Sequence, residues 1–320
     1  MHDGLIRNME PVSVIEGHID TVLTSKIRFY HKVESTPANM RAGNVQAAFY
    51  SLCPVNKPML VKRFTKFWFS YVRSPRHGLM QVRSIDDFDR ARKQGKIGAI
   101  LHYEGAGGID EGFTLLEEGA RQGLRGLCIT WADTNKFGHG AKFKGEQSTD
   151  GLTELGKELV ARAEGLGITI DVSHLNDPSF WDVVSVAKKP FIASHSNARA
   201  VCKHPRNLTD EQIKAVKEKG GTIGINFSVK FLDDGWKATN GKGVTFATIK
   251  KHIDHISSIA GIETVAMGSD YDGTKIPPCL QTPASYPALF QYLGENGYSK
   301  QDLHKIGHEN LLRVFKATWT

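Results

Sequence analysis

Six polar residues of this 320-residue chain follow short apolar segments that are rich in β-branched side chains. They are His18, Asp20, Glu104, His174, His195 and Asp270. Such segments are typical of buried parallel strands, and the carboxyl ends of the strands of a parallel barrel meet at one rim, where active sites lie. Imidazole and carboxylate groups together suit zinc-like cations, and one carboxylate can bridge two of them. The sequence therefore predicts a metal-binding site built from several strand ends.

Two of these short apolar runs each end in Ser-His. Residues 167–174 read Gly-Ile-Thr-Ile-Asp-Val-Ser-His, and residues 190–197 read Pro-Phe-Ile-Ala-Ser-His-Ser-Asn. The stretch between them, Asp177–Lys189, has apolar residues at helical spacing, so the three segments predict one strand–helix–strand unit. His174 and His195 then follow neighbouring parallel strands. This placement favours a shared metal ion over two unrelated core histidines.

Four further features concern single residues. In His18-x-Asp20 the strand period of two sends both side chains to the same side, so they can hold one ion together. His102 is ambiguous, because it precedes Glu104 by two positions and can share its face. Arg206 is equally consistent with a clamp for a substrate carboxylate and with a surface arginine. His139 lies in a long loop and is kept as a reserve candidate.

The rest of the chain alternates between strand-like and helix-like segments. The expected additional strands are Val12–Ile15, Ala47–Val55, Ile97–His102, Gly126–Thr130, Gly221–Phe227 and Glu263–Gly268. The expected additional helices are Met59–Arg73, Ser84–Gln94 with Ser84 as its N-cap, Phe113–Gln122, Thr153–Glu164, Thr209–Lys219, Phe246–Ile259, Ala284–Leu293 and Lys300–Lys316. Eight strand–helix alternations predict an α/β fold of the (β/α)8 TIM-barrel type, as a single domain over residues 1–320. The unpatterned stretch 133–150 predicts a long loop of the kind that often serves function.

Composition narrows the class of protein. The chain is 40% hydrophobic and 23% charged, as expected of a globular protein. Its four cysteines form no CxxC pair, which favours a reducing compartment. Residues 1–10 have no signal-peptide pattern, and no run reaches the roughly 18 apolar residues of a membrane span, so we expect a cytoplasmic protein with no membrane partner. The net charge of +7 is dispersed, and no nucleic-acid partner is expected.

One segment resembles a nucleotide-binding motif but lacks two of its features. Residues 151–158, Gly-Leu-Thr-Glu-Leu-Gly-Lys-Glu, imitate a phosphate-binding loop. Glu158 stands where that loop needs Ser or Thr, and the segment is helical rather than rich in glycine. We therefore do not expect nucleotide binding.

The chain as a whole resembles the membrane (renal) dipeptidase family of amidohydrolase-like binuclear metal hydrolases. The matching stretches occur in the family's order and are Glu16–Asp20, Glu104-Gly105, Gly151-Leu-Thr with Gly156 and Glu158-Leu-Val, Ile170–His174, Ser194-His195-Ser196, Arg206-Asn207, Gly268–Gly273 and Asn310–Phe315. Because they span nearly the whole chain, the resemblance is specific.

This resemblance implies two zinc ions per chain, although other divalent metals also suit such ligands. It implies that His18 and Asp20 hold one ion, that His174 and His195 hold the other, and that Glu104 bridges them. A hydroxide between the ions would attack the scissile carbonyl while the ions polarise it.

The resemblance also assigns roles toward a small, dipeptide-like substrate. Asp270 matches the acidic residue that contacts the substrate amine and shuttles a proton to the leaving nitrogen, which makes it catalytic together with Glu104. Arg206 matches the residue that holds the terminal carboxylate. The family often forms dimers, so a homodimer is the protein partner to expect.

Three positions depart from the family's pattern. Thr130-Trp131 stands where the animal dipeptidases have an oxyanion-stabilising His, and loss of one such donor typically costs about 10²–10³ in rate. Either His139 replaces it, or the substrate differs, so we place both Trp131 and His139 among the candidate substrate contacts. Glu16 replaces the usual Asp, and Ile19 the usual Asn.

The function predicted from the sequence is zinc-dependent hydrolysis of the amide bond of a dipeptide or dipeptide-like molecule. One alternative is an amidohydrolase-type enzyme that acts on another amide, such as an N-acyl amino acid, or that tailors a secondary metabolite. An alternative of another class is a catalytically weak metal-binding protein whose rim binds a partner.

Overall fold

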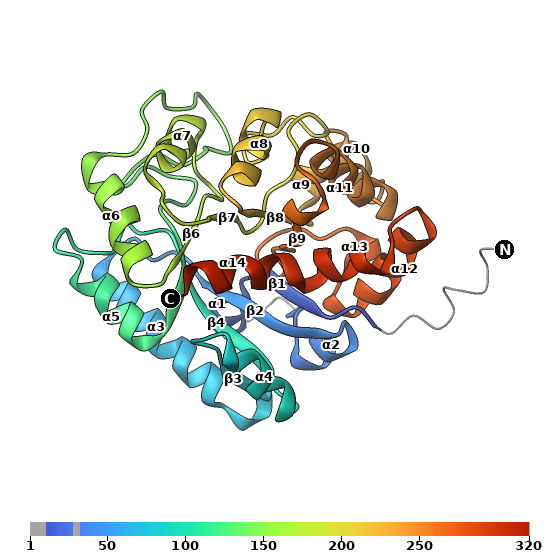
Figure 1. The fold of residues 1–320 in the computed structure, drawn as a ribbon, viewed down its shortest axis with the longest axis horizontal. Helices are drawn as coiled ribbons and strands as arrows, with labels where there is room; N and C mark the ends of the chain where they lie inside the picture. Colours follow the sequence, from blue (N-terminus) through green and yellow to red (C-terminus); the bar gives the residue numbers. More distant parts are fainter. Residues whose placement is uncertain (1–10, 28–32, 320) are drawn as a thin grey trace.

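Eight parallel strands close into a barrel in the computed structural model, which describes residues 11–27 and 33–319 (Figure 1). In their order around the barrel they are β1 (Val14–Ile19), β2 (Val45–Leu52), β4 (Ile97–Glu104), β5 (Leu124–Cys128), β6 (Thr169–Asp171), β7 (Ile192–Ala193), β8 (Thr222–Ile225) and β9 (Val265–Met267), which pairs again with β1. The predicted (β/α)8 barrel is confirmed. The prediction on a signal peptide concerns residues 1–10, which lie outside the described part.

Helices surround the barrel (Figure 1). They are α1 (Thr21–Ile27), α2 (Pro37–Ala42), α3 (Pro58–Arg73), α4 (Asp86–Lys93), α5 (Thr114–Gln122), α6 (Glu154–Gly165), α7 (Asp177–Val186), α8 (Asp210–Glu218), α9 (Val229–Leu232), α10 (Trp236–Thr239), α11 (Phe246–Ala260), α12 (Tyr286–Glu295), α13 (Lys300–His304) and α14 (Asn310–Thr318). Single 3-10 turns lie at Pro75–His77, Ile262–Thr264, Pro278–Leu280 and Pro283–Ser285. Among the described residues, none of the helices is both long and apolar enough to cross a bilayer.

The barrel interior changes from apolar to polar along its axis. On β4 the inward side chains are Ile100, His102 and Glu104 in that order, because side chains alternate along a strand. Ile100 belongs to a buried cluster that includes Phe49 of β2 and Phe315 of α14. Helix α14 lies across the barrel in Figure 1 and packs against these apolar residues at the amino ends of the strands. Polar side chains are thereby left at the carboxyl ends.

Strand β1 runs further than predicted. The apolar pattern stops at Glu16, but the strand continues to Ile19 because Glu16 is buried and paired. Its Oε1 accepts from the Ser269 N–H at 2.7 Å, and its Oε2 accepts from the Tyr286 hydroxyl. Burial raises the pKa of this carboxyl, and these hydrogen bonds oppose the rise.

Other boundaries differ for local reasons. Strand β3 (Leu79–Gln81) was not predicted, because three residues are too few to show an alternation of apolar and polar side chains. It pairs with the first residues of β4, which precede those that pair with β5. Helix α4 begins at Asp86 rather than at Ser84, whose N–H and hydroxyl both donate to Asp87. The predicted helix over 300–316 is interrupted by a π-helical turn, Lys305–Glu309.

Candidate metal centre

Two histidines and one carboxylate meet at the carboxyl end of the barrel. His174 follows β6, His195 follows β7, and Glu104 ends β4. The Nε2 atoms of the two histidines lie 2.8 Å apart. Glu104 Oε1 lies 2.8 Å from His174 Nε2 and 3.8 Å from His195 Nε2. All three residues are buried, so their polar atoms face one shared point inside the protein.

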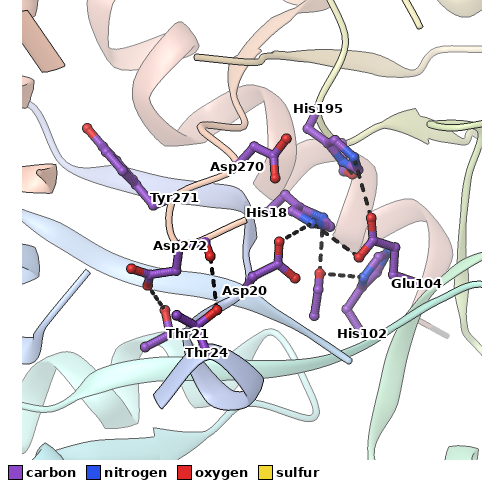
Figure 2. Close-up of polar contacts among 12 residues, drawn as sticks. His18, Asp20, Thr21, Thr24, His102, Glu104, His195, Asp270, Tyr271 and Asp272 are labelled. Atoms are coloured by element: carbon purple, nitrogen blue, oxygen red, sulfur yellow. Dashed lines mark hydrogen bonds and ion pairs between the residues drawn. The ribbon is translucent and has the colours of Figure 1, made fainter. Parts of the chain in front are cut away.

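A second set of ligand-type atoms lies on the other side of Glu104 (Figure 2). His18 Nε2 is 3.7 Å from Glu104 Oε2 and 3.8 Å from Asp20 Oδ2. His18, Asp20 and Asp270 also offer one ligand atom each within 4.8 Å of one another. Among the described residues His18 Nε2 has no hydrogen-bond partner, although it is buried. A buried nitrogen that faces carboxylates and has no hydrogen-bond partner is typical of a site that binds a cation.

The electrostatics of this end of the barrel also favour a cation. Burial raises the pKa of Glu104 to about 8 and that of Asp270 to about 7, although the charge on His18 opposes both shifts. Burial lowers the pKa of His18, but Glu104 and Asp20 outweigh it and raise that pKa to about 10. Crowded carboxylates thus hold protons that a metal ion would displace. The residues present fit a metal ion on both sides of Glu104.

Two site residues adopt backbone conformations that non-glycine residues seldom use. His174 has a φ of 74° and Asp270 a φ of 66°. The second is held by its surroundings: its N–H donates to the His18 carbonyl at 3.1 Å, and Asn226 Nδ2 donates to its Oδ2 at 3.0 Å. Left-handed residues of this kind cost free energy and cluster at functional sites. The strand ends are therefore shaped to direct these two side chains.

A layer of buried polar residues lies beneath the candidate ligands. Ser51 Oγ lies 3.0 Å from His18 Nδ1 and 2.8 Å from His102 Nδ1. His102 Nε2 lies 3.1 Å from Asp171 Oδ2, which also accepts from the Ser194 hydroxyl. His102 does share the inward face of Glu104, as the alternation suggested. Burial raises the pKa of Asp171, but the hydrogen bonds from His102 and Ser194 outweigh it, so this carboxylate keeps its charge.

Arg206 is buried beside the centre. Its Nη2 donates to the His195 carbonyl at 3.1 Å and its Nη1 to Ser196 Oγ at 3.4 Å. Its guanidinium lies 5.6 Å from the centre of the Phe231 ring. Within the described part of the chain no carboxylate pairs with it, and its Nε has no hydrogen-bond partner. A buried, unpaired guanidinium is costly, so an anionic group that reached Arg206 would be stabilised there.

A cavity of about 1120 Å³ opens onto Glu104, His174 and Asp270. One of its walls is aromatic. Trp131 lies 5.9 Å from the His174 ring and 5.5 Å from the Phe143 ring, and Phe143 stacks with Phe231 at 6.4 Å. Trp131 is 38% exposed and Phe143 42% exposed, so both rings present apolar surface to the cavity. Lys144, Lys230 and Lys237 also line it, and in the described part of the chain none of them forms an ion pair.

His139 is the one predicted site residue that the structure leaves apart. Its Nδ1 pairs with the Thr134 hydroxyl at 3.0 Å, and none of its hydrogen bonds within the described part of the chain involves another predicted site residue. The other eight predicted residues are His18, Asp20, Glu104, Trp131, His174, His195, Arg206 and Asp270, and they lie in or directly beside the centre.

The sequence reasoning missed two groups of residues. Asp171 lies three positions before His174 inside an apolar run, and a buried charge there was the available signal. Phe143 of a loop and Phe231 of helix α9 meet only in three dimensions, and no pattern in the sequence pairs them.

A (β/α)8 barrel with histidines and carboxylates gathered at the carboxyl ends of its strands defines a metal-dependent hydrolase. Comparison with known proteins gives the particular family. The sequence model of the family described as membrane dipeptidase (peptidase family M19) matches residues 6–320, so the chain belongs to the membrane dipeptidase family. The predicted family and the predicted enzyme class, a metal-dependent dipeptidase, are both confirmed.

Individual relatives agree with this assignment. An uncharacterized protein in the pqqA 5′ region of Klebsiella pneumoniae is 38% identical over 239 residues, which are 74% of this chain and 88% of that protein. The solved structure of a dipeptidase of metallopeptidase family M19 has a TM-score of 0.88 and 28% identity, covering 97% of this chain and 99% of its own. A metallopeptidase from Rhodobacter sphaeroides, solved with a phosphinate mimic of the dipeptide L-Ala-D-Ala, has a TM-score of 0.88 and 27% identity, covering 97% and 100%.

Proposed function

We propose that this enzyme uses two zinc ions to hydrolyse the peptide bond of small dipeptides. The observation that carries the proposal is the position of Glu104, whose two oxygens face His18 on one side and His174 on the other. His18 and Asp20 would hold one ion, His174 and His195 the second, and Glu104 would contact both. When bound, such a pair of ions lowers the pKa of a water molecule and polarises the scissile carbonyl.

The chain's own residues complete the reaction. Asp270 lies beside the ligands, and a pKa of about 7 suits a group that takes up and returns a proton near neutral pH. It would receive a proton from the attacking water and pass it to the leaving nitrogen. Arg206 would bind the substrate's terminal carboxylate, which supplies the anionic partner that its buried guanidinium lacks.

The aromatic wall supports a substrate with at least one apolar side chain. Trp131 and Phe143 expose ring surface to the cavity, and an apolar side chain packed there would leave water. The related Rhodobacter sphaeroides enzyme was solved with a dipeptide mimic, which supports a dipeptide as the substrate. We assign Trp131 to substrate contact, because its exposed ring lines the cavity.

Hydrolysis of an N-acyl amino acid is a second candidate function. The specific observation in its favour is the exposed pair Trp131 and Phe143, against which an acyl chain would pack as well as a side chain. Such a substrate lacks the free amine that a dipeptide presents near Asp270. The two functions therefore differ in a group that can be tested directly.

The first experiment is turnover of a substrate panel by zinc-reconstituted protein. The panel contains L-L dipeptides, L-D dipeptides and the matching N-acetyl amino acids, with His174→Ala as the inactive control. Turnover of dipeptides that is lost in the variant supports the proposal. Turnover confined to the N-acetyl compounds supports the second candidate, and a wild-type protein that binds zinc but cleaves neither class overturns both.

We also propose a single-domain, cytoplasmic enzyme that forms a homodimer. All four cysteines, Cys53, Cys128, Cys202 and Cys279, are free thiols, which supports a reducing compartment. The barrel uses residues from both ends of the described chain, since β1 and α14 pack in one cluster, and this supports one domain. Sedimentation of the purified protein tests the dimer.

A further inference from the structure

A continuous path of hydrogen bonds joins His18 to His195 through the interior of the barrel. It passes from His18 Nδ1 to Ser51 Oγ (3.0 Å), to His102 Nδ1 (2.8 Å), and from His102 Nε2 to Asp171 Oδ2 (3.1 Å). From Asp171 it continues through the Ser194 hydroxyl to His195 Nδ1, 2.7 Å from Ser194 Oγ. Figure 2 shows the part that runs beneath His18. Its residues lie in, or directly after, the five strands β1, β2, β4, β6 and β7. Its two ends are the histidines that we assign to different ions.

Asp171 can only accept hydrogen bonds in this path. Its Oδ1 accepts from the backbone N–H groups of Ser173 (2.9 Å) and Ser194 (3.0 Å), and its Oδ2 accepts from Cys128 Sγ at 3.1 Å as well as from the path. A carboxylate surrounded by donors has no proton to give. The direction of every hydrogen bond along the path is therefore set from this residue outward.

The direction on one arm follows from donor and acceptor counting. His102 must donate from Nε2 to Asp171, so the Nδ1 atom of neutral His102 is an acceptor. Ser51 has one hydroxyl proton and gives it to His102, so Ser51 Oγ accepts from His18. When His18 carries a single proton, as a metal ligand must, that proton lies on Nδ1, and the lone pair of Nε2 faces Glu104 and Asp20.

The other arm is shorter and gives the same result. Ser194 donates its hydroxyl proton to Asp171, so its oxygen accepts from His195 Nδ1. The lone pair of His195 Nε2 consequently faces Glu104, 3.8 Å from Oε1. Both imidazoles are thus held in the tautomer that a metal ion requires, and their rings lie 3.8 Å apart at the centroids.

We infer that Asp171 is a positioning residue that fixes the tautomers of His18 and His195 together, through Ser51 and His102 on one arm and Ser194 on the other. This inference rests on the proposed two-ion centre. It predicts that one buried carboxylate, which is not among the proposed ligands, controls the affinity of both ions.

His102, Cys128 and Asp171 could themselves be read as a third metal site, because one ligand atom from each lies within 4.8 Å of the others. Their mutual hydrogen bonds argue against that reading. His102 Nε2 and Cys128 Sγ both use Asp171 Oδ2 as acceptor, so each of the three candidate ligand atoms already has a hydrogen-bond partner. By contrast, His18 Nε2 in the centre above has none among the described residues.

Asp171→Asn is the decisive variant. The asparagine side chain keeps the shape of the aspartate, but its amide nitrogen donates hydrogen bonds, so the donor and acceptor roles along the path change. If the amide nitrogen replaces Oδ2, it donates toward Ser194 and His102, and the reversed path places the His18 proton on Nε2. If the amide flips, the nitrogen opposes the N–H groups of Ser173 and Ser194. Loss of a partner that orients metal-binding histidines typically weakens metal affinity by about 10–100-fold.

Variants in the two arms of the path test the effect on each proposed ion separately. Ser51→Ala cuts only the arm to His18, and Ser51→Thr restores a hydroxyl there. Ser194→Ala cuts only the arm to His195. Cys128→Ala is the matched control, since it removes one hydrogen bond to Asp171 without changing the direction of the path.

The measurements are zinc affinity by competition with a chelator, zinc content by mass spectrometry, and tautomer state by nitrogen NMR of ¹⁵N-histidine-labelled, zinc-loaded protein. We expect Asp171→Asn to weaken both ions, Ser51→Ala and Ser194→Ala to weaken one each, and Ser51→Thr and Cys128→Ala to match the wild type. Wild-type protein that binds two ions, with Asp171→Asn folded and equally tight, would overturn the inference and leave the proposed function standing. A third ion that Cys128→Ala removes would also overturn it. Wild-type protein that binds no zinc contradicts the two-ion proposal itself.

Discussion

The Nε2 atoms of His174 and His195 lie 2.8 Å apart, and both face the same oxygen of Glu104. Burial lowers the pKa of both imidazoles well below its usual value, and Arg206 and His18 lower them further. Two neutral rings that converge in this way present their lone pairs to one point, which is the arrangement that a divalent cation stabilises. Glu104 connects this point to His18, so removal of its charge affects both halves of the centre.

Glu104→Gln should therefore lose at least one ion and lower kcat by more than about 100-fold, because several kcal/mol of transition-state stabilisation come from the ions. The measurement is kcat on the most active dipeptide together with zinc content after dialysis. Glu117→Gln, on the outer helix α5, is the control and should behave as the wild type. Full zinc content in Glu104→Gln would contradict a bridging role.

Asp270→Asn should keep both ions and lose turnover. Proton transfer by a positioned side chain contributes about 10²–10⁴-fold, so kcat should fall by that factor. Asp270 also lies near His18 and Asp20 as a potential ligand, and zinc content decides between the two roles. A variant that loses an ion along with activity would show that Asp270 is a ligand rather than a proton carrier.

Arg206→Ala should raise KM for dipeptides with a free terminal carboxylate and leave the corresponding amides unchanged. Hydrogen bonds to charged groups contribute about 1.5–3 kcal/mol, so the expected rise in KM is about 10–100-fold. Arg199→Ala is the matched control, since Arg199 already pairs with Asp177 through two contacts of 2.7 Å. Equal effects on acids and amides would remove Arg206 from carboxylate binding.

The convergence of the candidate ligands could be predicted from the sequence because of how a parallel barrel is built. The strand-end rule predicted that His174 and His195 lie at neighbouring strand ends. The strand period allowed His102 to share the face of Glu104 but left its role open, and the structure places both side chains on the inward face of β4. The relation of Asp171 to Ser51 crosses the barrel interior, and no local spacing in the sequence encodes it.

The wall of the cavity could not be predicted for a related reason. Phe143 belongs to a loop without periodicity, and its partner Phe231 precedes the end of a four-residue helix. Both contacts depend on where loops fold back over the barrel. The role of His139 in substrate contact stays a prediction; in the structure its Nδ1 pairs with the Thr134 hydroxyl.

Trp131→Ala should weaken binding of substrates with large apolar side chains and spare those with small ones. Aromatic contacts contribute about 0.5–1.5 kcal/mol beyond area burial, so KM for a Phe-containing dipeptide should rise by about 3–10-fold, with little change for Ala-Ala. Trp181→Ala is the control, because Trp181 is similarly exposed at 42% but lies on the outer helix α7. Equal KM changes for both dipeptides would show that Trp131 supports the loop and does not select the substrate.

His252 makes the fold sensitive to acid beside the site. It is fully buried on α11, where its Nδ1 accepts from the Ala198 N–H at 3.2 Å and its Nε2 lies 3.1 Å from the Leu232 carbonyl. Burial lowers the pKa of this imidazole to about 4. Protonation of Nδ1 would set a second donor against the N–H of Ala198, which lies three positions after His195 in the chain.

The sign of the pH effect follows from proton binding in the two states. Between the unfolded pKa of about 6.5 and the folded pKa, the unfolded state binds more protons, so the free energy of unfolding falls as the pH is lowered. Above that range His252 is neutral in both states and contributes no pH dependence. The free energy of unfolding should fall by on the order of 3 kcal/mol between pH 7 and pH 4. Glutamine cannot be protonated in this range, so the His252→Gln variant lacks this pH dependence. When the free energy of unfolding is measured by urea at several pH values between 7 and 4, the values for the wild type and the variant should approach each other as the pH falls. A difference in the free energy of unfolding that stays constant with pH would show that the folded protein accepts the proton on His252 without cost.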